Sequence, residues 1–383
     1  PAIMKAKELG YEVIVVDYDK NAVGFQLADI KLLVSTIDQE EVYKQALIYK
    51  PDYIMTSTSD APVKTAAYIN EKLGKPTGIS YDDAICATNK EFMRKRLRFY
   101  NVPIPKFYIA KCYEEFKNAI SNFSDLCIIK PADNAGSRGV QLFDPNSFEE
   151  HIKEMYEYTL EYSRNGVVLI EEYMIGKEVS VEAMTVNSET FIITVTDKMV
   201  TEAPFFVELG HSQPSMLNDD IKRKVIQITK NAIHAIGIVN GPSHTEIKIT
   251  SDGPKVVEIA ARLGGDFITS KLVPISTGVD IVGSSVLLAI GEPVDLSIKK
   301  DEGVAIRFIC GESGYIKKIK INDNIQNMDG IVEIKFYKEE GDYISRPKSS
   351  NDRIGHVITK ADTAKQAIDI AEKVISQIDI QMY

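Results

Sequence analysis

The chain has 383 residues, of which 44% are hydrophobic and 26% are charged, a composition typical of a globular protein with two or three domains. Its formal net charge of −10 argues against a nucleic-acid-binding surface, which needs a basic face. No apolar run approaches the ~20 residues of a membrane span, and the four cysteines form no CxxC pair. We therefore predict a reduced, cytoplasmic protein without nucleic-acid or membrane partners.

The first 80 residues predict short α/β units. We expect helices over 3–9, 40–49 and 62–73, and strands over 11–17, 32–35 and 53–56. Such alternation predicts an open parallel sheet ending near residue 80, and we expect a further strand before it, outside this chain. Asp17 ends the first strand and is interpreted as a turn acid, because no GxGxxG accompanies it.

Two lysines follow at positions where a cation is informative. Lys90 lies in the first turn of a helix that we expect to run to Tyr100, where the helix dipole disfavours a positive charge. Lys130 ends a strand over 126–131 and precedes the small-residue loop 132–140, which contains Ser137 and Arg138. Such a loop lets backbone N–H groups approach a phosphate. It is not a Walker A loop, and most loops of this kind are plain turns.

Residues 167–184 predict two strands around a bend at Gly176. The first ends in Glu171, Glu172, Tyr173 and Met174, which offer backbone groups and a carboxylate to an adenine edge, and Glu178 follows the bend. The alternative is an acidic hairpin.

Residues 202–215 are too irregular for a helix or a long strand, and we expect a loop before a helix over 219–235. Glu208 and His211 stand three apart in it. Because loops carry function disproportionately, both are candidates for substrate contact; a histidine that only holds the loop is the alternative.

The next stretch predicts a β-hairpin, with strands over 244–249 and 256–262 joined by a turn at 251–254. Alternation places Glu258, Ala260 and Arg262 on one face, and it places Val257, Ile259 and Ala261 on the other, towards a core. Glu246 lies on the partner strand. Two carboxylates can hold Mg²⁺ with phosphate oxygens completing its shell, and an arginine beside them suits a transferring phosphoryl group. Alone, such a hairpin is more often an exposed charged face.

The last part predicts a helix over 281–290, short strands between 305 and 337, a strand over 353–359 and a closing helix over 361–378. We therefore predict three domains: residues 1–80, residues 81–293 with a lid-bearing lobe at about 110–180, and an α+β domain over 294–383.

Taken together and in this order, these stretches resemble the ATP-grasp superfamily of ligases, specifically its biotin-carboxylase-like branch. The resemblance implies a mixed α/β and α+β fold, with a truncated Rossmann-like domain, a two-lobed ATP-grasp domain and a C-terminal domain. It implies ATP and Mg²⁺ (or Mn²⁺) as cofactors, small-molecule carboxylate and amine substrates, and a homodimer.

The resemblance also implies roles for individual residues. Lys90 and Lys130 match the phosphate-binding lysines, the loop 134–140 with Ser137 and Arg138 matches the lid, and Glu171–Met174 match the adenine-binding segment. Glu178 matches the ribose-binding acid, and Glu246 and Glu258 match the metal ligands. Arg262 matches the arginine near the transferred phosphate. The resemblance therefore implies that Arg262, Glu258 and Lys130 are catalytic. Ala260 stands where many members carry asparagine as a further metal ligand, which weakens an assignment as a biotin carboxylase or carbamoyl-phosphate synthase.

Within the superfamily, the pairing of Glu-Leu-Gly-His at 208–211 with the segment 258–266 is similar to the dipeptide-forming L-amino-acid ligases. That similarity places Glu208, His211, Arg262, Gly264 and Gly265 at the substrate, and implies an ADP-forming ligase that works through an acyl phosphate. Three alternatives stay open: a purine-pathway ligase of the phosphoribosylamine–glycine type, an enzyme using bicarbonate or making carbamoyl phosphate, and a non-catalytic nucleotide-binding module.

Overall fold

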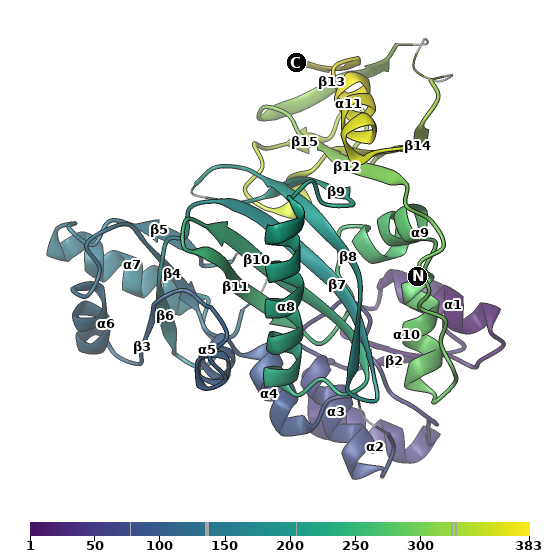
Figure 1. Cartoon of the computed structure of the whole chain (residues 1–383), viewed down its shortest axis with the longest axis horizontal. Coiled ribbons are helices and arrows are strands. Elements are labelled where there is room, and N and C mark those ends of the chain that lie inside the picture. The colour runs from purple at the N-terminus through teal and green to yellow at the C-terminus, as the bar shows by residue number, and fades with distance from the viewer. Residues whose placement is uncertain (77, 135–137, 204, 323–324, 326–327) are drawn as a thin grey trace.

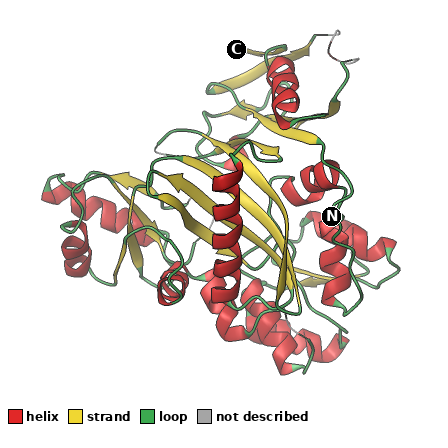
Figure 2. Ribbon diagram, in the orientation of Figure 1, coloured by secondary structure: helices red, strands yellow, loops and turns green. Residues whose placement is uncertain are grey.

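An eight-stranded sheet forms the centre of the molecule, with the strand order β11-β10-β7-β8-β9-β12-β16-β14 (Figures 1 and 2). The computed structural model describes residues 1–76, 78–134, 138–203, 205–322, 325 and 328–383. The strands of this sheet are β7 (Lys177–Val186), β8 (Glu189–Val200), β9 (Glu208–Gln213), β10 (Gly241–Thr250), β11 (Gly253–Ala260), β12 (Gly303–Ile309), β14 (Ile331–Phe336) and β16 (Gly355–Ala361). All the pairings within it are antiparallel.

Helices pack against this sheet, and β12 is buried along its whole length. The helix α8 (Asp219–Ile236) lies across one face (Figure 1), and its Val225 and Ile233 share a core with Val256 and Ile259 of β11. A second core contains Leu272, Ile281 and Ile306. Its helical part comprises a π-helical turn (Ile268–Leu272), α9 (Val273–Thr277) and α10 (Ile281–Ala289).

The first part of the chain contains a parallel pair of strands, as the sequence predicts. Its elements are α1 (Ala2–Glu8), β1 (Ile14–Asp17), β2 (Ile30–Leu33), α2 (Gln39–Tyr49) and α3 (Val63–Lys72), and β1 pairs with β2. The strand predicted over 53–56 is wrong. The Asn70 side chain receives a hydrogen bond from the Ile54 N–H (3.2 Å) and donates one to its carbonyl (2.7 Å), so an amide occupies backbone groups that a neighbouring strand would use.

A four-stranded sheet with the order β3-β6-β4-β5 lies beside the central one (Figure 1). It consists of β3 (Phe107–Ala110), β4 (Cys127–Pro131), β5 (Gln141–Phe143) and β6 (Val168–Glu172), with α6 (Tyr113–Ile120) and α7 (Glu149–Glu161) packed on its core. The helices α4 (Tyr81–Thr88) and α5 (Lys90–Phe99) precede it. The bend at Gly176 (φ +148°) separates the two predicted strands, β6 and β7, and they enter different sheets.

The C-terminal part adds β13 (Gly314–Ile321), β15 (Tyr343–Ile344), α11 (Ala364–Ile375) and β17 (Ile378–Met382), and the order of the small sheet is β15-β13-β17. The closing helix predicted over 361–378 is too long, because residues 378–382 pair with β13 as a strand. The central sheet itself continues from β9 into β12, across the predicted boundary at 293/294. The mixed α/β and α+β architecture is confirmed.

No single helix in the described part of the chain is long and apolar enough to cross a membrane. The helical segments 268–277 and 281–289 reach the apolar length of a membrane span only when they are taken together, and the chain bends by 113° between them.

Candidate active site

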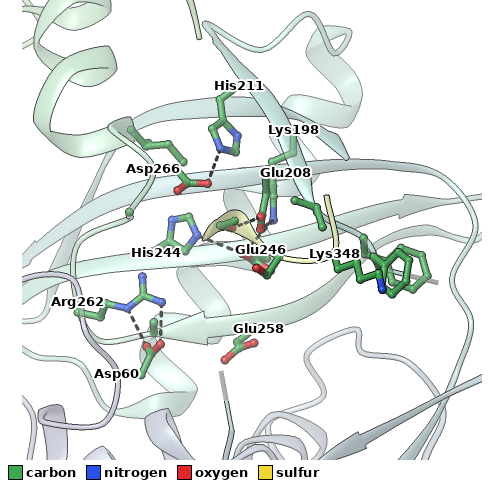
Figure 3. Close-up of a pocket in the computed structure, with 18 residues that line it drawn as sticks. Asp60, Lys198, Glu208, His211, His244, Glu246, Glu258, Arg262, Asp266 and Lys348 are labelled. Atoms are coloured by element: carbon green, nitrogen blue, oxygen red, sulfur yellow. Dashed lines mark hydrogen bonds and ion pairs between the residues drawn. The ribbon is translucent and has the colours of Figure 1, made fainter. Parts of the chain in front are cut away.

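A cavity of about 250 Å³ opens where the central sheet meets the first and last parts of the chain (Figure 3). Most of its lining is charged or aromatic. The lining consists of Asp60, Lys198, Phe205, Phe206, Val207, Glu208, His211, His244, Glu246, Glu258, Ala260, Arg262, Gly265, Asp266, Ile268, Lys348, Ser349 and Ser350. The structure therefore brings together six predicted site residues from three separate stretches: Glu208, His211, Glu246, Glu258, Arg262 and Gly265.

The two predicted metal carboxylates face each other across the β10–β11 hairpin, since Glu246 and Glu258 are directly paired in register. Glu246 Oε1 lies 3.0 Å from Lys198 Nζ and 3.4 Å from His244 Nε2, and Glu258 Oε1 lies 3.1 Å from Lys90 Nζ. Burial alone would raise the pKa of Glu246, but the charges of Lys198 and His244 hold that pKa well below its usual range. Glu246 is thus placed to remain ionised.

Two carboxylates supply only part of a cation's coordination shell. Among the described residues, no group of three or more His, Cys, Asp or Glu side chains is arranged to hold a metal ion. Hard oxygen ligands from a pair of acids nevertheless suit Mg²⁺, which keeps water and substrate oxygens in its shell.

The hairpin differs from the predicted alternation at one position. Glu246 pairs with Glu258, but Ile247 pairs with Val256, so Val257 is the extra residue of a β-bulge. Val256 therefore fills the core in place of the predicted Val257, whereas Ile259 lies in the core as predicted. The Val257 carbonyl instead accepts a hydrogen bond from Arg94 Nη2 (2.7 Å). The bulge links the hairpin to α5.

Arg262 is held by an acid that sequence reasoning gave no role. Asp60, just before α3, accepts hydrogen bonds from Arg262 Nε (2.8 Å) and Nη2 (3.0 Å), and the Leu263 N–H donates to the Ser57 carbonyl. This fork geometry fixes the plane of the guanidinium, and the Asp60 carboxylate helps to raise the pKa of Arg262 against the lowering effect of burial. No motif in the sequence marks Asp60.

The predicted phosphate lysine Lys130 belongs to a buried ion network. Its Nζ lies 2.6 Å from Glu171 Oε2, and the same carboxylate accepts from Arg94 Nε (2.7 Å) and Nη2 (3.1 Å). Burial would raise the pKa of Glu171, but the two cations outweigh it and lower that pKa to about 2. The Glu171 carboxylate is thus fully engaged by protein cations, and the structure does not leave it free for the predicted contact with adenine.

Glu171→Gln should destabilise the fold by about 3 kcal/mol, because it leaves two buried cations without their counter-charge. The folded-state pKa near 2 lies below the ordinary value of 4.5, so the contribution is complete above about pH 4.5 and is lost as the pH falls towards 2. Urea unfolding of both proteins between pH 3 and 7 measures this. If the difference in unfolding free energy between the wild-type chain and Glu171→Gln grows as the pH falls, the stabilising role of the Glu171 carboxylate is contradicted.

The rest of the predicted nucleotide contacts lie around this network. Glu172 forms an ion pair with Lys255 (2.5 Å) and accepts a hydrogen bond from the Lys106 N–H. The centre of the Tyr173 ring lies 6.1 Å from the centre of the Phe206 ring. Lys90 Nζ donates to the carbonyl of Asn134, a residue of the predicted loop, at 2.8 Å. Met174 is half-buried and Arg138 exposed. Ser137 lies outside the described residues, as do Ala135 and Gly136 of the same loop.

Lys198 is a central residue of the cavity that sequence reasoning missed. Its buried ammonium lies 2.6 Å from Glu178, 3.0 Å from Glu246 and 4.0 Å from Glu208. Burial opposes its charge, yet the three carboxylates raise the pKa of Lys198 above its ordinary value. One cation thus contacts the predicted ribose acid and a predicted metal ligand, and approaches a predicted substrate acid. Nothing in the local sequence marks it, because its partners come from other strands.

Glu208 and His211 lie on β9, so the predicted loop is wrong at this point. A β-bulge at Leu209, where Val200 pairs with Glu208 but Met199 pairs with Gly210, shifts the alternation by one residue. Both side chains therefore face the cavity although they are three residues apart.

Two further residues that sequence reasoning missed hold this end of the cavity. Arg353 donates to both oxygens of Asp266 (2.8 Å each), and its Nη2 lies 3.3 Å from Glu208 Oε2. His211 Nε2 lies 3.5 Å from Asp266. Glu208 is held more loosely, since its carboxylate contacts among the described residues are all 3.3 Å or longer, to Arg353, Ser350 and Lys198. It is the acid at this end with the most freedom to exchange partners.

A second acid–histidine pair lies beneath the glycines. His244 Nδ1 contacts the fully buried Glu182 at 2.7 Å. Burial would lower the pKa of His244, but Glu182 and Glu246 raise it to about 9. A Cβ on Gly264 would lie 2.7 Å from both Glu182 Oε2 and His244 Nδ1, whereas a Cβ on Gly265 would meet nothing within 4 Å. Gly264 is therefore required by this pair and does not line the cavity, while Gly265 does.

Gly264→Ala should accordingly lower the free energy of unfolding by about 2 kcal/mol, because its methyl group would displace a buried ion pair. Gly265→Ala is the matched control, with an expected change below about 0.5 kcal/mol. Urea unfolding of the two variants tests this. Equal stability of both variants would show that the chain relaxes around residue 264.

Residues 123–270, which carry most of this cavity, match the ATP-grasp domain family, and the chain therefore carries an ATP-grasp domain. Residues 307–383, which include the cavity residues Lys348–Ser350, match the family described as L-amino acid ligase C-terminal domain 2.

Two curated relatives match about three quarters of this chain. An uncharacterized protein, y4rH, of Sinorhizobium fredii is 28% identical over 293 residues, covering 76% of this chain and 60% of that protein. An L-arginine-specific L-amino acid ligase of Bacillus subtilis is 25% identical over 309 residues, covering 78% of this chain and 73% of that protein. This chain thus spans 60% and 73% of the lengths of these two relatives.

Solved structures share the fold over the whole chain. An L-amino acid ligase from Bacillus licheniformis aligns with a TM-score of 0.83 at 19% identity, covering 100% of this chain and 95% of that one. A phosphoribosylglycinamide synthetase from Anaerococcus prevotii aligns with a TM-score of 0.77 at 25% identity, covering 100% of this chain and 96% of that one. The likeness to the L-amino acid ligase, at 19% identity, concerns the fold alone.

Proposed function

We propose that this chain is an ATP-dependent, ADP-forming carboxylate–amine ligase that acts on amino-acid-like substrates. One observation carries the proposal: two paired carboxylates, Glu246 and Glu258, and the pinned Arg262 share a cavity with the loosely held Glu208. The first three suit phosphoryl transfer, and the last suits a substrate ammonium group. The ligase relatives support the same reading.

In this proposal the nucleotide lies between the two sheets. Glu246 and Glu258 would hold Mg²⁺, which supplies charge neutralisation at the transferring phosphoryl group. Lys90 and Lys130 face the phosphates, the segment 172–174 faces adenine, and Glu178 faces ribose. Glu171 positions Lys130 through the ion pair described above.

The reaction takes place in two steps. A substrate carboxylate oxygen attacks the γ-phosphorus of ATP and ADP leaves, which gives an acyl phosphate. The neutral amine nitrogen then attacks the acyl carbon, inorganic phosphate leaves, and the proton that the nitrogen loses passes to this phosphate. Arg262 stabilises the negative charge that develops on the transferred phosphoryl group and the acyl oxygen, and Asp60 keeps its guanidinium in place. Catalysis of this type depends mainly on positioning and electrostatics.

At the other end, Glu208 pairs with the ammonium group of an amino acid, and His211, oriented by Asp266, contacts the same group. The three parts of the chain contribute as follows: residues 1–80 supply Asp60, residues 81–293 supply most of the cavity, and residues 294–383 supply its rim and Arg353.

A phosphoribosylamine–glycine ligase is the second candidate, favoured by the likeness to the phosphoribosylglycinamide synthetase. Its phosphoribosyl substrate needs several available cations. In the described part of the lining, Lys198, His244 and Arg262 are each paired with a carboxylate. That pairing favours the amino-acid reading.

Glu208→Ala should raise the KM of the amino acid at least about 10-fold, because one charged contact to an ammonium group is lost, and should leave the KM of ATP within about 3-fold. Initial rates of ADP release with amino acids from a pairwise screen measure both constants. Glu189→Ala, which removes an exposed acid at the start of β8, is the control. A parallel rise in the KM of ATP would instead place Glu208 at the nucleotide.

A further inference from the structure

Lys348 occupies an unusual place among the cations of the cavity. Lys198, His244 and Arg262 are each within 3.0 Å of a carboxylate oxygen. Lys348 lines the same cavity, but no carboxylate of the described residues lies within ion-pair distance of its ammonium, which sits 5.9 Å from the centre of the Phe205 ring. An anion that enters this end of the cavity therefore finds Lys348 available.

The backbone that carries Lys348 is firmly held. Asp352 accepts hydrogen bonds from the N–H groups of Lys348 (2.9 Å) and Ser349 (2.8 Å). Ser350 Oγ donates to Glu208 (3.3 Å), and Arg353 Nη2 donates to the Glu208 carbonyl (2.9 Å). These contacts attach the segment 348–353 to β9, so that Lys348 has a defined position at the rim.

The position of Lys348 relative to the reacting groups is informative. In Figure 3, Lys348 lies on the side of the cavity away from Arg262 and Asp60, with Glu208 and Glu246 between them. The surrounding acids Glu208, Glu246, Glu258 and Asp266 make this a poor environment for a second anion, unless a cation offsets them.

Amide formation between two amino acids creates a demand for such a cation. The partner that supplies the amine keeps its own carboxylate as a spectator throughout the reaction. We propose that Lys348 binds this carboxylate, and that Phe205 and Phe206 form the wall for the side chain of the same partner. This inference rests on the proposed function.

The test compares each of the twenty L-amino acids with its carboxamide as the amine partner, in the presence of ATP, Mg²⁺ and an acid partner that the wild-type chain accepts. A carboxamide cannot serve as the acid, so it reports the amine position alone. Lys348→Met should raise the KM of the amino acid roughly 5-fold, in line with one partly exposed ion pair, and leave the KM of the carboxamide unchanged. Lys348→Glu should exceed that effect.

Lys317→Met is the matched control, because Lys317 is also exposed and lies 5.9 Å from the centre of an aromatic ring, that of Tyr383, away from the cavity. It should change neither constant. Three outcomes of Lys348→Met would overturn the inference. The KM of the amino acid and that of its carboxamide could change equally, neither could change, or the KM of the acid partner alone could change. Absence of any amide product from the wild-type chain would contradict the proposed function itself.

Discussion

Glu258→Gln is expected to lower the turnover number at least about 100-fold. The change removes one of two anionic ligands from a hard-cation site but keeps the size of the side chain. It also removes the partner of Lys90, which lies 3.1 Å away. Steady-state ADP release at saturating ATP and amino acids measures the loss.

Nucleotide affinity separates this effect from unfolding. Binding of ATP to the Glu258→Gln chain, measured by calorimetry, should weaken far less than turnover does, because the substitution leaves the proposed contacts to adenine and ribose untouched. Asp252→Asn, at the exposed turn of the same hairpin, should leave turnover unchanged. A Glu258→Gln protein with near-normal turnover would contradict the metal assignment.

Arg262→Met should reduce turnover by about 100-fold to 1,000-fold, as the loss of one preorganised donor does at sites where negative charge develops. Asp60→Asn should have a smaller effect of about 10-fold, because the guanidinium remains but loses its charged fork. Both are measured as the turnover number and the KM of each substrate. If Arg262 only ties the first part of the chain to the sheet, the two variants should lose stability and not turnover.

The sequence predicts the local elements well because hydrophobic periodicity and caps determine them. Asn89 caps α5 by accepting the Glu91 N–H (2.9 Å), and α8 begins and ends within one residue of its predicted bounds. The prediction of a strand over 53–56 was wrong, because the sequence cannot reveal that the Asn70 side chain binds the backbone N–H and carbonyl of Ile54.

Much of the candidate site was predictable for a similar reason. Glu246, Glu258 and Arg262 come from one hairpin, so alternation along a strand brings them together. The two β-bulges, at Val257 and Leu209, were not predictable, because a bulge leaves no mark in the spacing of residues. Asp60, Lys198 and Arg353 were missed because each meets its partners through tertiary packing of distant segments.

The most direct test of the proposed ligase activity is the stoichiometry of the reaction. Purified protein is incubated with ATP, Mg²⁺ and all pairwise combinations of the twenty L-amino acids, and ADP, inorganic phosphate and amide product are quantified by chromatography and mass spectrometry. The proposed mechanism predicts at least one pair that gives the three products in equal amounts, and none of them with Glu258→Gln. ADP release without amide for every pair, or no ADP release at all, would contradict it.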